Sequence, residues 1–276
     1  MKTVCSLCPH HCQLEPGQSG LCQARRNKNG KIICDNYGRL TALALDPIEK
    51  KPLRRFYPGS WILSVGSYGC NLRCPFCQNY KISMEGKKSE TIFLSPKDLV
   101  KRAMNLAEKA RGNLGIAFTY NEPLIGYEYV YDCAELAHQV GLKTVIVTNG
   151  MICEEPLLKL LPLTDAMNID LKGFTQQYYD WVGGDLETVK NTIAVSASQC
   201  HVEVTTLIIP GKNDRTEEMN AEAKWIASLN PEIPLHISRF FPCWHVPGQE
   251  PTPVQTISSL CREAKEHLQY VYAGNC

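Results

Sequence analysis

The sequence predicts an α/β fold, a partial (β/α)6 barrel of the TIM type, preceded by a small cysteine-rich module. Two observations lead to this prediction. From residue 61 onward, short apolar runs alternate with amphipathic stretches, which is typical of βα units around a parallel sheet. Residues 1–60 lack this alternation and hold five of the 14 cysteines. We therefore expect two domains, a metal-binding module at 1–60 and the barrel at 61–276, although an open doubly wound sheet has the same local pattern.

The barrel elements are expected in a regular order along the chain. Apolar runs predict six strands and a weaker seventh, at 61–67, 114–119, 144–148, 166–171, 202–209, 234–238 and 269–273. Amphipathic stretches predict helices at 99–110, 124–140, 154–161, 186–198, 216–229 and 253–268. Ser95, Pro96 and Asp98 form a helix start, with a side-chain cap, a first-turn proline and an acid three residues after the cap. Ligands of such folds gather at the C-terminal ends of the strands.

The composition excludes several classes of protein. A chain of 276 residues that is 44% hydrophobic can bury a sizeable core, which rules out disorder and a fibrous fold. The 29 Lys plus Arg nearly balance the 28 Asp plus Glu, so we expect no nucleic-acid partner and no attraction to an anionic membrane. Residues 1–20 hold three cysteines and two histidines rather than an apolar signal, and no apolar run approaches the ~20 residues that span a bilayer. We expect a cytoplasmic protein, in which clustered thiols more often hold metal than form disulfides.

Three cysteines follow the first predicted strand with C-x3-C-x2-C spacing, namely Cys70, Cys74 and Cys77. They supply three of the four ligands that a [4Fe-4S] cluster or a tetrahedral zinc ion requires. One metal position is then left open for a substrate or cofactor. The alternative is a zinc site whose fourth ligand comes from elsewhere in the chain.

With the aromatic Phe76 before its last cysteine, this motif resembles the signature of the radical S-adenosylmethionine (SAM) superfamily. The resemblance implies an oxygen-sensitive oxidoreductase in which the three cysteines bind a [4Fe-4S] cluster, SAM chelates the fourth iron and Phe76 belongs to the cofactor site. It also implies that SAM is cleaved reductively to a 5′-deoxyadenosyl radical, which abstracts hydrogen from a protein, peptide or small-molecule substrate. The electron would come from a reductant such as flavodoxin or ferredoxin.

Glu122 follows the second predicted strand, at the position where members of this superfamily carry a Gly-Gly-Glu type motif that binds the SAM ammonium group. Tyr120 and Asn121 replace the two glycines. The resemblance implies that Glu122 makes this contact, and a helix-start acid is the alternative.

The next two strand ends resemble those of pyruvate formate-lyase activating enzymes. Thr148 and Asn149 open a Thr-Asn-Gly motif, and Asp170 and Lys172 belong to an Asp-Leu-Lys motif. The resemblance implies that these four residues contribute to the SAM site. Val147 replaces an acid that helps bind a monovalent cation in those enzymes, so cation binding beside Asp170 is left open, as is a helix-capping role for this acid.

Four further cysteines lie within 18 residues of the N-terminal module: Cys5, Cys8, Cys12 and Cys22. Four thiolates can close a tetrahedral shell, which predicts a closed site for zinc or an auxiliary iron-sulfur cluster, with the spacing slightly favouring zinc. His10, His11 and Cys34 are alternative ligands. Unliganded or disulfide-bonded cysteines are the other interpretation. At the far end of the chain, His236, Arg239 and Cys243 are weaker candidates for contact with a substrate.

The N-terminal cysteines, the run Asp-Pro-Ile-Glu-Lys-Lys-Pro-Leu that begins at Asp46, and the cluster motif together resemble the radical SAM component of the AmmeMemoRadiSam group. That group is related to the pyruvate formate-lyase activating enzymes. Its members continue into a tail with a further C-x2-C, whereas this sequence ends at Cys276. Two other functions are weighed: a glycyl-radical enzyme activase, and a non-enzymatic zinc or nucleic-acid binding module built on the N-terminal cysteines.

Overall fold

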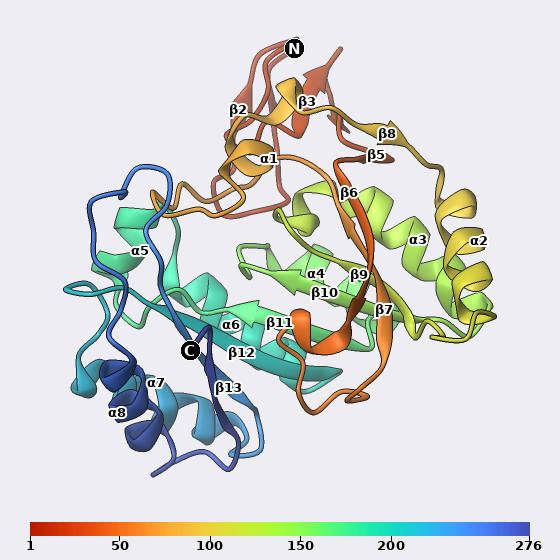
Figure 1. The fold of residues 1–276 in the computed structure, drawn as a ribbon. Helices are drawn as coiled ribbons and strands as arrows, with labels where there is room; N and C mark the ends of the chain where they lie inside the picture. The colour runs from red at the N-terminus through yellow and green to blue at the C-terminus, as the bar shows by residue number, and fades with distance from the viewer.

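The main sheet has eight strands in the order β14-β13-β12-β11-β10-β9-β7-β6, in a computed structural model that describes residues 1–276 apart from the side chain of Lys87. Seven strands run parallel: β7 (Trp61–Gly66), β9 (Gly115–Phe118), β10 (Lys143–Thr148), β11 (Ala166–Asp170), β12 (His201–Ile208), β13 (Leu235–Arg239) and β14 (Val271–Gly274). Each lies at a predicted position, so the α/β barrel prediction is confirmed (Figure 1).

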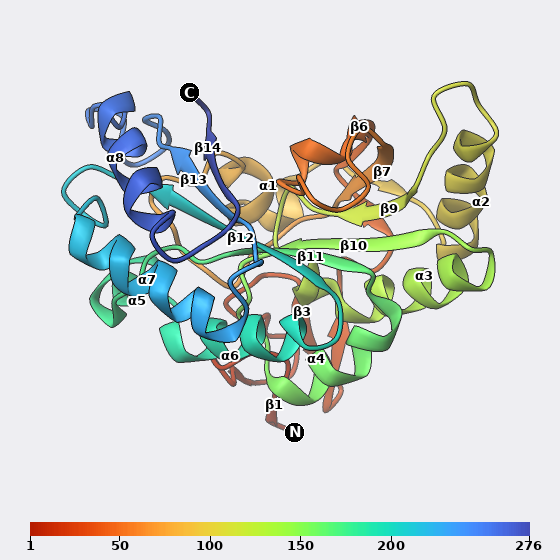
Figure 2. The ribbon, with the colours of Figure 1, turned by 90° about the horizontal axis from the view of Figure 1, so that it is seen from below.

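The sheet contains one strand that the sequence pattern did not predict. β6 (Ala42–Pro47) pairs antiparallel with β7 at one edge, and β14 is the other edge. These two edges do not pair, so the barrel is open between them (Figure 2). The predicted boundary at residue 60 stays a prediction, but the main sheet itself includes β6.

The predicted helices are present within a few residues of their expected bounds. They are α2 (Pro96–Ala107), α3 (Tyr127–Gln139), α4 (Glu154–Leu160), α6 (Leu186–Ala197), α7 (Thr216–Leu229) and α8 (Val254–Ala264). Ser95 caps α2 as predicted, because its side chain accepts a hydrogen bond from the backbone N–H of Asp98 at 3.2 Å. The sequence did not predict α1 (Tyr80–Met84) or α5 (Gln176–Val182). The main helices cover the outer face of the sheet (Figure 2).

The strands are apolar because helices cover one of their faces and the barrel interior covers the other. All four residues of β9 are buried, and Ile116 in this strand has no exposed surface. Val145 and Ile146 in β10 are also fully buried. Each such side chain contributes about 1.5–3 kcal/mol through burial. This core fixes the strand ends, from which the polar residues of the site project.

The N-terminal residues pack against the loop that carries the Cys70 motif. They form short hairpins, β1 (Thr3–Val4) with β2 (Gln13–Leu14) and β3 (Arg25–Lys28) with β4 (Lys31–Cys34), while β5 (Arg39–Leu40) pairs with β8 (Ile92–Phe93). Gly69 has φ +90°, and a Cβ there would collide with the carbonyl of Cys22. His10 Nε2 lies 2.7 Å from the carbonyl oxygen of Asn71. Because only glycine has no Cβ, only glycine at position 69 lets the loop of the Cys70 motif lie this close to the backbone of Cys22.

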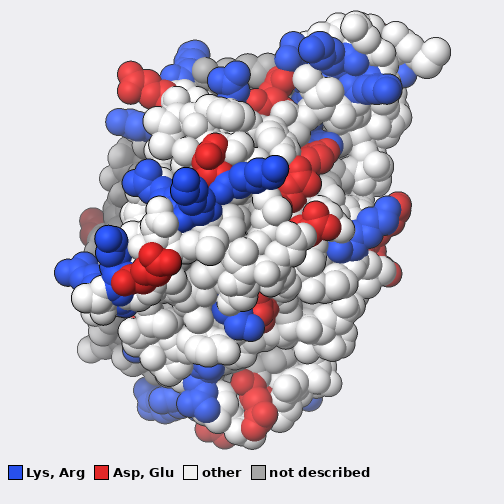
Figure 3. Space-filling view, turned by 90° about the vertical axis from the view of Figure 1, so that its right-hand side faces the viewer, with Lys and Arg blue, Asp and Glu red and all other residues white. Residues whose placement is uncertain are grey.

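Charged side chains of both signs are interspersed over the surface. Figure 3 shows Lys and Arg next to Asp and Glu on one face, in keeping with the near-zero net charge. Among the described residues, none of the helices combines the length and the apolar character that a membrane span requires.

A buried acid on α7 gives the fold a pH dependence. Glu222 is 1% exposed and pairs with the Thr206 hydroxyl, and burial raises its pKa to about 8. In the unfolded chain this carboxyl titrates near its ordinary value of about 4.3, so the folded state loses stability as pH rises from there toward 8. We expect Glu222→Gln to stabilise the protein by roughly 2–4 kcal/mol at pH 7.

Urea unfolding at pH 6, 7 and 8 measures this effect. The advantage of Glu222→Gln over the wild type should grow with pH, whereas Glu266→Gln, at an exposed position, should change nothing. An advantage that stays constant between pH 6 and 8 would show that Glu222 titrates normally.

Candidate active site

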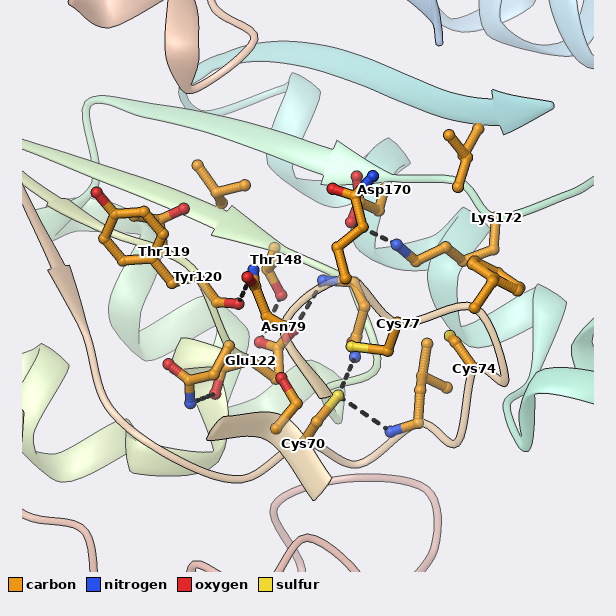
Figure 4. Close-up of a pocket in the computed structure, with 18 of the residues that line it drawn as sticks. Cys70, Cys74, Cys77, Asn79, Thr119, Tyr120, Glu122, Thr148, Asp170 and Lys172 are labelled. Carbon is orange, nitrogen blue, oxygen red and sulfur yellow. Dashed lines mark hydrogen bonds and ion pairs between the residues drawn. The ribbon is translucent and has the colours of Figure 1, made fainter. Parts of the chain in front are cut away.

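One cavity of about 340 Å3 lies at the C-terminal ends of the parallel strands. All of the residues predicted for the cluster and the SAM site line it: Cys70, Cys74, Phe76, Cys77, Glu122, Thr148, Asn149, Asp170 and Lys172 (Figure 4). They come from the loops after β7 and β9 and from the ends of β10 and β11. This is the edge of a parallel sheet at which ligands bind in such folds.

The cysteine loop is held by backbone and side-chain donors. Cys70 Sγ accepts hydrogen bonds from the Leu72 N–H at 3.4 Å and from Asn149 Nδ2 at 3.6 Å. Burial raises the pKa of all three cysteine thiols, that of Cys74 to about 12. Donors aimed at sulfur stabilise a thiolate ligand and tune the potential of a cluster.

Phe76 is fixed by aromatic neighbours. Its ring centroid lies 5.4 Å from that of Trp181 and 6.4 Å from that of Phe240, and the residue is 4% exposed. Because these rings limit its motion, Phe76 forms a rigid wall of the cavity.

Glu122 joins the ends of β9 and β10. Its Oε1 accepts from the Leu124 N–H at 3.0 Å and from the Thr148 hydroxyl at 2.7 Å, and its Oε2 accepts from the Asn149 N–H at 2.7 Å. A carboxylate offers about four acceptor positions, so one on Oε2 is left for a further donor. Burial raises the pKa of Glu122 to about 7 against these lowering hydrogen bonds. An added cation would therefore favour its ionised form.

Asp170 and Lys172 form an ion pair beside the cysteines. Lys172 Nζ lies 2.6 Å from Asp170 Oδ2. Burial alone would lower the pKa of Lys172, but Asp170 and the nearby Cys74 outweigh it and raise that pKa. The pair therefore places a carboxylate and an ammonium group next to each other on one wall, as Figure 4 shows.

The weaker C-terminal candidates lie outside this cavity. His236 Nε2 is 2.6 Å from Glu203 Oε2, and Arg239 Nε donates to the carbonyl of Thr252 at 2.6 Å. Cys243 Sγ lies 3.7 Å from the carbonyl of Cys77. Among the residues that the structure describes, none of these three lines the cavity, although Cys243 contacts the backbone of the cavity residue Cys77 from outside it.

Lys50, Lys51 and Tyr120 are among the cavity residues that sequence reasoning did not assign to the site. Lys50 and Lys51 belong to the motif after Asp46 that was used only as a family resemblance. Tyr120 was noted only as a replacement for a glycine. Two signals in the sequence could have identified them: two adjacent lysines after a strand, and a tyrosine at a position where the superfamily has glycine.

The four N-terminal cysteines line a second cavity, which is narrow, with a volume of about 10 Å3, and which His10 also borders. Cys34 lies apart from it and contacts Asn36. All 14 cysteines are free thiols. Across the described residues, no group of three or more His, Cys, Asp or Glu side chains has the arrangement of a metal site. The metal predicted here therefore stays a proposal.

The family model of the radical SAM superfamily matches residues 64–223, which is more than half of the chain. The chain belongs to the radical SAM superfamily. It is an enzyme of this class, and the family implies a [4Fe-4S] cluster and SAM as its cofactors. The family resemblance stated from the cysteine motif is confirmed, whereas the narrower AmmeMemoRadiSam resemblance stays a prediction.

Relatives by sequence agree with this membership. An uncharacterized protein of Methanocaldococcus jannaschii is 40% identical over 280 residues, covering 99% of this chain and 81% of that protein. The pyruvate formate-lyase-activating enzyme of Clostridium pasteurianum is 29% identical over 157 residues, covering 53% of this chain and 63% of that enzyme. This radical SAM chain is thus related to the activating enzymes.

Solved structures share the fold. A domain of a pyruvate-formate lyase-activating enzyme from Bacteroides vulgatus superposes with a TM-score of 0.51 at 17% identity. The match covers 58% of this chain and 99% of that domain. Streptococcus suis SuiB, in a structure with SAM bound, superposes with a TM-score of 0.57 at 14% identity, covering 76% of this chain and 48% of that one. These likenesses concern the radical SAM fold alone.

The types of residue that line the cavity fit the two cofactors that the family implies, while the three cysteines there, like the N-terminal ones, are not arranged around a common metal position in the described structure. Three thiols line the cavity, and no described histidine or fourth cysteine joins them there. This donor set provides three of the four ligands of a [4Fe-4S] cluster. The free acceptor position on Glu122 and the Asp170–Lys172 pair match the ammonium and carboxylate groups of an amino acid.

Proposed function

We propose that this radical SAM enzyme cleaves SAM reductively in the cavity, and that the radical formed from SAM abstracts hydrogen from a substrate. When bound, the [4Fe-4S] cluster supplies the electron that breaks the sulfur–C5′ bond of SAM, which yields methionine and a 5′-deoxyadenosyl radical. The observation that carries this proposal is the convergence of three cysteines, Glu122 and the Asp170–Lys172 pair on one cavity of a radical SAM chain.

The chain's own residues act by binding and orientation. Cys70, Cys74 and Cys77 hold the cluster. Glu122 Oε2 accepts a hydrogen bond from the SAM ammonium group, while the hydrogen bonds from Thr148 and Asn149 keep the carboxylate in place. Lys172 donates to the SAM carboxylate and is oriented by Asp170. Phe76 closes the wall and excludes water from the reacting atoms.

The test is anaerobic reconstitution with iron and sulfide, reduction with dithionite, and chromatography of the products after SAM is added. We expect 5′-deoxyadenosine and methionine in equal amounts. A preparation with a full cluster by iron and sulfide analysis that forms neither product would overturn the proposal. Flavodoxin or ferredoxin is the expected reductant in place of dithionite.

A second candidate is activation of a glycyl-radical enzyme, with a protein as substrate. Two observations favour it: the relation to the Clostridium pasteurianum enzyme, and the Thr148–Asn149 and Asp170–Lys172 sites in the cavity. The decisive measurement is the EPR spectrum of a glycyl-radical enzyme incubated with this chain, SAM and reductant. A glycyl doublet supports activation, and a silent spectrum from a competent preparation rejects it for that partner.

For the N-terminal cysteines we propose one structural zinc ion. Cys5, Cys8, Cys12 and Cys22 line one narrow cavity, and four cysteines are a common ligand set of structural zinc. We expect Cys22→Ser to lose about one zinc per chain and to retain the iron of the barrel site. Elemental analysis of both proteins measures this, and a loss of iron instead of zinc would assign an auxiliary cluster.

A further inference from the structure

The motif that begins at Asp46 closes the floor of the barrel. β6 ends at Pro47 and η1 (Ile48–Lys50) follows, after which the chain contacts side chains of β11 and β12. Glu203 in β12 accepts hydrogen bonds from the backbone N–H groups of Arg54 at 2.9 Å and Arg55 at 2.7 Å. Asn168 in β11 donates to the carbonyl of Pro52 at 3.0 Å. Held from both sides, this segment directs Lys50 and Lys51 to the cavity, which both side chains line.

A three-residue cluster fixes Lys51. Its side chain is 2% exposed, and Nζ lies 3.0 Å from Asp46 Oδ2 and 4.7 Å from the centroid of the Tyr120 ring. The Tyr120 hydroxyl donates to the same Asp46 oxygen at 2.7 Å. Burial alone would raise the pKa of Asp46, but Tyr120 and Lys51 outweigh it and lower that pKa to about 2. Asp46 is therefore an anion that holds both partners.

The charges at this end of the cavity do not cancel. Lys50 Nζ, on a side chain that is 67% exposed, lies 3.4 Å from Asp46 Oδ1, so one carboxylate serves two ammonium groups. The net charge of the three residues is 2 − 1 = +1. At the cluster end, Asp170 is paired with Lys172, and burial raises the pKa of Glu122 to about 7, so this carboxyl carries only part of a negative charge at pH 7. The excess positive charge of the cavity therefore lies at the end lined by Lys50 and Lys51.

Tyr120 occupies a backbone conformation that favours glycine. Its φ is +73°, at a position where the superfamily pattern has glycine, and such a residue costs roughly 1–2 kcal/mol. Its ring packs over Gly66, whose added Cβ would lie 2.8 Å from the ring. Figure 4 shows Tyr120 across the cavity from Lys172 and Cys74. A strained tyrosine in contact with Asp46 and Lys51 indicates that its side chain serves this end of the cavity.

We propose that Lys50 and Lys51, held by Asp46 and Tyr120, form a subsite that binds an anionic group of the substrate, a carboxylate or a phosphate. The inference deepens the proposed function, on which it rests, because it names the substrate class of the same cavity. Ammonium groups bind both kinds of oxyanion, and the excess positive charge leaves Lys50 able to take an external anion.

The test is protection of Lys50 from reductive methylation by formaldehyde and cyanoborohydride, measured by peptide mass spectrometry on the full chain with its cluster reconstituted. The probes are inorganic phosphate and acetate, each compared with sodium chloride at the same ionic strength. We expect at least one probe to slow methylation of Lys50 by about threefold or more at millimolar concentration, and Lys224, exposed on α7, to be unaffected. Protection by phosphate alone assigns a phosphate, and protection by acetate assigns a carboxylate.

Two variants and one competitor make the test decisive. Lys51→Met should abolish the protection, and Tyr120→Phe, which keeps the ring and loses the bond to Asp46, should weaken it. Protection should persist in saturating SAM; if SAM alone protects Lys50 and the anions then add nothing, the lysines belong to the SAM site and the subsite is rejected. Equal methylation in all salts also rejects it. Normal protection without 5′-deoxyadenosine formation would contradict the radical chemistry alone, and the converse result would contradict the subsite alone.

Discussion

Replacement of Cys74 by alanine should abolish formation of 5′-deoxyadenosine from SAM, with a loss of at least about a thousandfold. Partners that only orient a metal ligand already cost about 10–100-fold when they are removed, and Cys74 is itself a proposed ligand, one of only three in the cavity. Among the described residues, the cavity is lined by no cysteine that could replace it, since Cys70 and Cys77 are themselves proposed ligands. Product chromatography after anaerobic reduction measures the effect, together with iron per chain.

The matched control is Cys261→Ala. Cys261 is a buried thiol on α8 that lies outside the cavity, so the variant loses a similar side chain and should keep both its iron and its activity. If Cys74→Ala forms product at the wild-type rate, the assignment of the three cysteines to the cluster is wrong. If both variants lose product, protein stability rather than ligation explains the loss.

Replacement of Glu122 by glutamine should raise the dissociation constant of SAM by about 10- to 100-fold. A hydrogen bond to a charged group contributes roughly 1.5–3 kcal/mol, and glutamine removes the charge that the SAM ammonium group would meet. Equilibrium dialysis with labelled SAM against the reconstituted protein measures this affinity.

Thr148→Val distinguishes the effect of the Glu122 charge from that of the hydrogen bonds that hold its carboxylate in place. This variant removes one of the three donors to the carboxylate and keeps the charge, so we expect a loss of SAM affinity of only about threefold. Thermal unfolding of both variants checks that the fold survives. Unchanged SAM binding in Glu122→Gln would exclude this residue from the ammonium contact.

Local patterns predicted most of the barrel because its central parallel strands are buried on both faces. β9 and β10 are short apolar runs between helices, and Ser95 and Asp98 predicted the start of α2. β6 escaped prediction since this edge strand, Ala42–Pro47, is half-exposed and its short apolar run contains only Ala and Leu, with none of the β-branched or aromatic residues that favour strands. The short helix α5 was missed because its buried residues are largely aromatic and its apolar period covers only two turns.

The residues of the candidate site that belong to one local motif could be predicted from their spacing. Those that the folded barrel brings together from distant parts of the chain could not. The cysteine motif is local, so Cys70, Cys74 and Cys77 could be read directly. The contact between Tyr120 and Asp46 joins residues 74 positions apart, and nothing in either local sequence indicates it. Lys51 likewise lines the cavity next to a segment that is bonded to Asn168 and Glu203, residues 116 to 149 positions further along the chain.

The central claim is that three cysteines hold a [4Fe-4S] cluster with one position open to SAM. The most direct measurement is the EPR spectrum of the reduced, reconstituted protein before and after SAM is added under conditions that prevent turnover. We predict that SAM changes the g-values of the cluster signal in the wild type. We predict that Cys74→Ala shows no cluster signal, with or without SAM. A full-occupancy cluster whose spectrum is the same with and without saturating SAM would contradict the account.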